Sequence, residues 1–74
     1  MACLKDIRSG NNARIVFIEA GRCCHHRLAE MGLLPGERVN MLFNGGSGAV
    51  TVCVKGTKIS IGAGLAEKIK VREE

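Results

Sequence analysis

The side chains best suited to chemistry form one run, Cys23-Cys24-His25-His26, with Glu30 close behind it. On an α-helix, Cys23, His26 and Glu30 lie on one exposed face, because residues three or four positions apart are neighbours there. A thiolate, an imidazole and a carboxylate on one face could bind Zn²⁺ or Fe²⁺. Structural zinc normally takes four ligands, so this set of three favours an ordinary exposed His26 and Glu30 pair. An iron or zinc site is the alternative.

The same run could also form a Cys-His nucleophile pair, since a neighbouring histidine can activate a thiol. Contiguous residues point to different sides of a helix, however, and no third group is evident to orient the histidine. The glycine runs at 45–48 and 62–64 do not match a phosphate-binding loop, and turn formation explains them better. We therefore expect no catalytic residue, no cofactor and no enzymatic activity.

A helix must position this run, and it is expected over residues 22–31, the only stretch with a helical period. The stripe predicted to face the core consists of Cys24, Leu28 and Met31. Gly32 follows at the place of a left-handed cap, where a Schellman motif would press Leu33 against Leu28. A type II turn is predicted over residues 34–37, because a proline is followed by a glycine at its centre.

The rest of the chain has the period of two that is typical of strands. Strands are expected near residues 13–19, 38–43, 50–54, 57–61 and 69–71. The first of them is either covered on both sides or bulged, whereas Val39, Met41 and Phe43 share one face of the second. A glycine-rich hairpin tip at 44–48 and a helical turn at about 63–67 complete the pattern. We predict a mainly β single domain over residues 1–74, a small, partly open SH3-like barrel of about five strands with one inserted helix.

The composition fits a small folded domain that works by binding. A chain of 74 residues has room for one core, and no stretch approaches the ~20 apolar residues of a membrane span. The 4 cysteines lack the C-x-x-C spacing, so we expect reduced thiols and a cytoplasmic protein. The net charge of +4 favours acidic partners, while the lack of Trp and Tyr argues against nucleic acid as a partner.

The chain also resembles the FeoA family over nearly its whole length. The strongest part is the segment 27–39, RLAEMGLLPGERV, which is similar to the family pattern R-L-x-E-[LM]-G-[LI]-x-P-G-x-x-[VI]. Supporting matches are Leu4, Ile7, Gly10, Ala13 and Ile15, with segments 59–61 and 65–71. The resemblance implies a cytoplasmic SH3-like accessory protein of bacterial ferrous iron uptake. It implies as partner FeoB, a membrane protein that joins a cytoplasmic GTP-binding domain to an iron permease.

Two segments depart from this family. Many members carry an L-G-D-P-like tip between the second and third strands, where this chain has residues 45–49, GGSGA. The run at 23–26 is not a family signature either, so a metal role for it would be particular to this protein. The same barrel also occurs in iron-dependent repressors, but no helix-turn-helix that could read DNA is visible here.

A regulator of this kind must present a contact surface outside its core. Leu34 stands at a family position that is often polar, so we expect it to be an exposed anchor, with a buried fit against Met31 as the alternative. A basic rim is expected from Arg27, Arg38, Lys55 and Lys58. This surface predicts binding to an acidic protein surface that weakens as salt rises.

Overall fold

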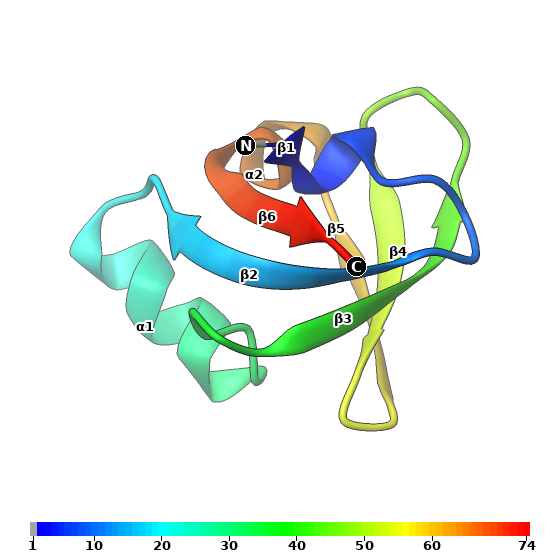
Figure 1. Cartoon of the computed structure of the whole chain (residues 1–74). Helices are drawn as coiled ribbons and strands as arrows, with labels where there is room; N and C mark the ends of the chain where they lie inside the picture. Colours follow the sequence, from blue (N-terminus) through cyan, green and yellow to red (C-terminus); the bar gives the residue numbers. More distant parts are fainter. Residues whose placement is uncertain (1) are drawn as a thin grey trace.

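The computed structural model describes residues 2–74 and shows a mainly β fold built on one antiparallel sheet (Figure 1). Its elements are β1 (Ala2–Cys3), the 3-10 helix η1 (Leu4–Asp6), β2 (Asn12–Ile18), α1 (Arg22–Glu30), β3 (Arg38–Asn44), β4 (Val50–Val54), β5 (Thr57–Ile61), α2 (Ala63–Lys68) and β6 (Ile69–Glu73). None of the helices in residues 2–74 is long and apolar enough to cross a membrane.

The sheet has six strands in the order β1-β6-β2-β3-β4-β5, and every neighbouring pair is antiparallel. Figure 1 shows the sheet curling round, with β2 and β3 passing in front of β4 and β5. The end strands β1 and β5 are not neighbours, so the barrel is partly open. The predicted fold class is confirmed. The strand beyond the expected five is β1, whose two residues carry no period that could reveal it.

Two β-bulges determine which strand side chains point away from the core. The register of β2 against β6 shifts between Ile15 and Phe17, and that of β3 against β4 shifts between Met41 and Phe43. An extra residue at such a bulge turns the rest of the strand over, and both phenylalanines are exposed as a result. The bulge in β2 is one of the two predicted alternatives. The single face predicted for Val39, Met41 and Phe43 is wrong, because Phe43 lies beyond the bulge and is 62% exposed.

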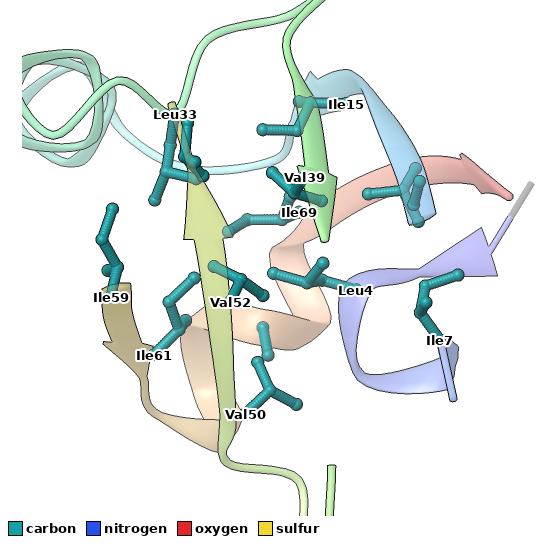
Figure 2. Close-up of a cluster of buried hydrophobic side chains, with 14 of the residues drawn as sticks. Leu4, Ile7, Ile15, Leu33, Val39, Val50, Val52, Ile59, Ile61 and Ile69 are labelled. Atoms are coloured by element: carbon teal, nitrogen blue, oxygen red, sulfur yellow. The ribbon is translucent and has the colours of Figure 1, made fainter. Parts of the chain in front are cut away.

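The core consists of aliphatic side chains, mainly from alternate positions of the strands. Figure 2 shows Leu33 towards one side of this cluster and Ile7 at the other, with Val39, Ile69 and Leu4 between them. Among residues 2–74 no polar or charged residue is buried. Stability therefore depends on the packing of apolar surface and not on buried ion pairs.

The end of α1 has the predicted cap. Gly32 has a φ of +90°, and its N–H donates to the Ala29 carbonyl at 3.0 Å. The Leu33 N–H donates to the Leu28 carbonyl at 2.8 Å, and both leucine side chains are buried. These two hydrogen bonds and the apolar contact define a Schellman motif. The helix ends at Glu30, one residue before the predicted end at Met31, and the chain re-enters the core at Leu33.

The predicted core-facing stripe of α1 is correct only at Leu28. Cys24 is exposed, and Met31 is 44% exposed. Figure 1 shows α1 beside one end of the sheet and not across its face, so the helix meets the core along a short line. Leu28 is the one buried residue within Arg22–Glu30. The other two apolar positions of the stripe are therefore open to solvent or to a partner.

The last residue fastens β6 to β2. The Glu74 N–H donates to the Asn12 carbonyl at 3.0 Å, and Arg14 Nε donates to Glu74 Oε2 at 2.9 Å. The hydrogen bond from Arg14 lowers the pKa of the Glu74 carboxyl below its usual 4.5. Because this ion pair is exposed, it contributes little to stability and mainly fixes the position of Glu74.

Candidate functional site

A mostly apolar hollow lies between α1 with its cap and Leu65 of α2. Its volume is about 180 Å³, and its lining residues are Cys24, Arg27, Leu28, Met31 and Leu65. Leu65 belongs to α2 and is half-buried, while the other lining residues come from α1 and its cap. Cys24 and Met31, which the sequence predicted to face the core, thus line a surface hollow instead. A hollow with apolar walls suits an apolar side chain from a partner.

Leu34 lies next to this hollow along the chain and is 43% exposed, as expected for an anchor. A rigid turn holds it there: the Glu37 N–H donates to the Leu34 carbonyl at 3.0 Å, and Gly36 has a φ of +93°. This confirms the predicted type II turn. The Gly36 N–H also donates to the Ile15 carbonyl at 2.7 Å, so the turn is tied to β2. The backbone at Leu34 is therefore held in one conformation by the turn.

The four predicted basic residues differ in their surroundings. Arg38 Nε lies 3.4 Å from Glu74 Oε1, and Lys55 Nζ lies 3.1 Å from Glu37 Oε2. In residues 2–74, Arg27 and Lys58 have no carboxylate within 4.0 Å, and both are exposed. Arg27 and Lys58 are therefore the members of the basic rim with charge available to a partner.

The pair of Lys55 and Glu37 also joins two segments at this end of the molecule. Glu37 Oε2 is buried and has no hydrogen bond among the described residues, so the nearby Lys55 ammonium is its only compensation. Lys55 itself occupies the β4–β5 turn with a φ of +51°, followed by Gly56 at +81°. Positive φ at both central residues is typical of a type I′ hairpin turn. The ion pair thus places this hairpin beside the turn that carries Leu34.

The metal-binding alternative is only partly assembled. His26 Nε2 lies 3.7 Å from Glu30 Oε1, which is the expected exposed pair. Cys23 is an exposed free thiol on the same helix. Within residues 2–74, no group of three or more His, Cys, Asp or Glu side chains is placed to hold a metal ion. The Cys23, His26 and Glu30 set stays a prediction that the geometry does not strengthen.

Metal removal tests this alternative directly. We expect a chelator to leave the melting temperature of the purified protein unchanged, because the core is complete without Cys23 or His26. The measurement is thermal unfolding with and without chelator, together with the metal content of the purified protein. A stoichiometric metal whose loss unfolds the protein, and whose binding is lost in Cys23→Ser, would establish the site instead.

Comparison of the chain with known protein families shows to which family it belongs. The family model described as the FeoA domain matches residues 3–73. The chain belongs to the FeoA family. The segment 27–39 of this FeoA-family protein comprises the end of α1, the cap, the type II turn and the start of β3. This segment lies within the matched range and contains Arg27, Met31 and Leu34.

Individual relatives agree with this assignment. A Methanocaldococcus jannaschii protein named as a candidate Fe(2+) transport protein A is 35% identical over 66 residues, which cover 89% of this chain and 79% of that protein. The crystal structure of an iron uptake regulatory protein, FeoA, is 30% identical and superimposes with a TM-score of 0.90, covering 99% of this chain and 97% of that one.

A further likeness extends to the fold alone. A manganese-dependent transcriptional repressor is 19% identical, with a TM-score of 0.86 over 99% of this chain and 41% of that one. The same small β fold therefore also occurs as part of a larger protein. At this identity the likeness says nothing about shared activity.

Proposed function

We propose that this FeoA-family protein is a cytoplasmic regulator of ferrous iron transport that binds the GTP-binding region of an FeoB-like iron transporter. Family membership and the Fe(2+) transport relative support a role in ferrous iron transport. The FeoA family consists of small accessory proteins, and the proposal assigns no catalytic residue to the chain. Regulation would follow from binding alone.

One observation carries the choice of surface: Met31, which lines the hollow at the end of α1, and Leu34, three residues further along the chain, are both exposed. Exposed apolar side chains that stand beside a hollow are typical of protein contact sites. Burying them would provide most of the affinity, because desolvated apolar anchors contribute more to residence time than charges at a rim do. Arg27 and Lys58 would then speed association with an acidic surface of the transporter.

The test is a titration of the labelled protein with the isolated GTP-binding region of an FeoB-like transporter. Leu34→Asp should weaken binding by about tenfold or more, because it places a charge where an apolar group is desolvated. Leu42→Asp is the matched control, since Leu42 is 40% exposed and lies on β3, away from the hollow. Both variants should keep the fold, because neither leucine belongs to the core.

Salt and nucleotide complete the design. Binding should weaken as salt rises, because the proposed rim charges act through solvent. If both proteins are folded and no binding occurs with or without a guanine nucleotide, the proposed partner is wrong. If Leu34→Asp and Leu42→Asp weaken binding equally, the proposed partner stands but the proposed contact surface is wrong. If binding does not weaken as salt rises, only the proposed role of the basic rim is contradicted.

A further inference from the structure

The sheet ends in an open edge at β5. β5 neighbours only β4 in the strand order, and no other described element packs extensively against it. Figure 2 shows Ile59 and Ile61 on β5, and both are buried in the core. The opposite end of the sheet is β1, with two residues, whereas β5 has five. Of the two ends, β5 is long enough to pair with a further strand.

The register identifies the backbone groups that point outward. The two-residue turn at Lys55 and Gly56 makes Val54 and Thr57 a hydrogen-bonded pair, and hydrogen-bonded pairs then recur at every second residue. Lys58 and Ser60 are the intervening residues, so their N–H and C=O groups face the open side. No hydrogen bond links these four groups to any other part of residues 2–74. An antiparallel strand could therefore make four hydrogen bonds along this edge.

The charge along the edge indicates which strand would fit. Residues 55–64, KGTKISIGAG, contain two lysines and no acidic residue, and side chains from Ser60 onward are mostly small. Small side chains let a second backbone approach closely. Two copies of this chain, each with a net charge of +4, would bring their lysine edges together and repel. An acidic segment of another protein is electrostatically favoured over a second copy.

A second hollow beside the β5 edge indicates which side chain an added strand should carry. It has a volume of about 350 Å³ and is lined by Phe43, Ser47, Ala49, Val50, Thr51, Ser60, Ile61 and Gly62. Phe43 pairs with Thr51, which pairs with Ser60, so these outward side chains form one row across β3, β4 and β5. A residue opposite Ser60 on an added strand would continue this row and adjoin the hollow.

We propose that β5 binds an extended acidic segment of a partner protein as an added antiparallel strand. The segment has an apolar residue opposite Ser60 and an acidic residue two positions later, opposite Lys58, because antiparallel strands run in opposite directions. Its recognition pattern is thus apolar-x-acidic. This contact goes beyond the proposed transporter surface and shares only Lys58 with it, so strand addition is tested at Ser60, and Lys58→Glu tests only the preference for an acidic segment.

The probe is a synthetic nine-residue peptide with Phe-Thr-Glu at its centre and alternating Val and Thr around it, titrated to millimolar concentration. We expect the largest NMR shift changes at the amides of Lys58 and Ser60. Ser60→Pro should weaken binding by about tenfold or more, because proline has no N–H to donate to the added strand. The variant should still fold, because an edge strand tolerates proline where its N–H faces outward. Ser60→Ala is the matched control and should bind within about twofold, since it keeps that N–H.

Charge is tested in the same way. Lys58→Glu should weaken binding, and Arg72→Glu, which makes the same charge change on β6, should not. A peptide with Lys in place of Glu should bind more weakly than the acidic peptide. Absence of binding at millimolar peptide, equal binding to Ser60→Pro and Ser60→Ala, or shift changes centred on another element would each overturn the proposal. Dimerisation through β5 in the free protein would overturn it too.

Discussion

Leu28→Ala is expected to lower the free energy of unfolding by about 2–5 kcal/mol, which is the usual cost of truncating a fully buried leucine. Leu28 is 1% exposed and is the only buried residue of α1. Its carbonyl also accepts the Schellman hydrogen bond from Leu33. A domain of this size has a net stability of only a few kcal/mol, so a large part of the population should be unfolded.

The measurement is urea unfolding of the wild type, Leu28→Ala and Met31→Ala, followed by circular dichroism. Met31 lies at the same end of α1 but is 44% exposed, so truncating it should cost less than about 1 kcal/mol. If the two variants lose the same stability, Leu28 is not the residue that fixes α1 to the core. The wild type serves to establish that unfolding has two states.

Gly48→Ala should be the most damaging single-methyl addition in the β3–β4 hairpin. Gly48 has a φ of +104°, and a Cβ built there would lie 2.7 Å from the Cβ of Ala63, at the start of α2. The backbone strain alone costs about 1–3 kcal/mol for a residue with a side chain. The steric overlap adds to this cost, because neither Cβ is the end of a flexible side chain that could move away.

Two further variants separate strain from overlap. Gly46 has a φ of +87° and nothing within 4 Å of its Cβ position, so Gly46→Ala reports the strain without the overlap. The double variant Gly48→Ala/Ala63→Gly removes the overlapping methyl and should be more stable than additivity predicts. Thermal unfolding of the wild type, Gly48→Ala, Ala63→Gly and the double variant measures the coupling, and Gly46→Ala is unfolded beside them. An additive double variant, or equal losses at Gly46 and Gly48, would contradict the close packing of this hairpin on α2.

The parts of the fold that the sequence predicts are those that depend on neighbouring residues. The Schellman cap at Gly32 and the turn over residues 34–37 need particular backbone angles within a few residues, so glycine and proline reveal them. β1 escapes prediction because its two residues become a strand only by pairing with Val71 and Lys70, far along the chain. A pattern among neighbouring residues cannot reveal a pairing between segments so far apart in the sequence.

The candidate site shows the same limit. The exposure of Leu34 can be expected from its place after the cap. The exposure of Met31 and Cys24 cannot, because it depends on how little of α1 meets the sheet. Leu65 enters the hollow from α2, and no spacing in the sequence connects it with α1. The bulge that exposes Phe43 arises from pairing with β4, so strict alternation misplaced that residue.

The insertion of β6 between β1 and β2 determines when this protein can fold on the ribosome. β6 is the last of the strands to be synthesised, yet it supplies the hydrogen-bonding partner for both of the first two. Until residues 69–73 have left the exit tunnel, β1 and one side of β2 lack their partner. Pairing between such distant segments is slow compared with local contacts. The sheet can therefore be completed only once β6 is available, and until then the unpaired early strands are the part most exposed to chaperones and to aggregation.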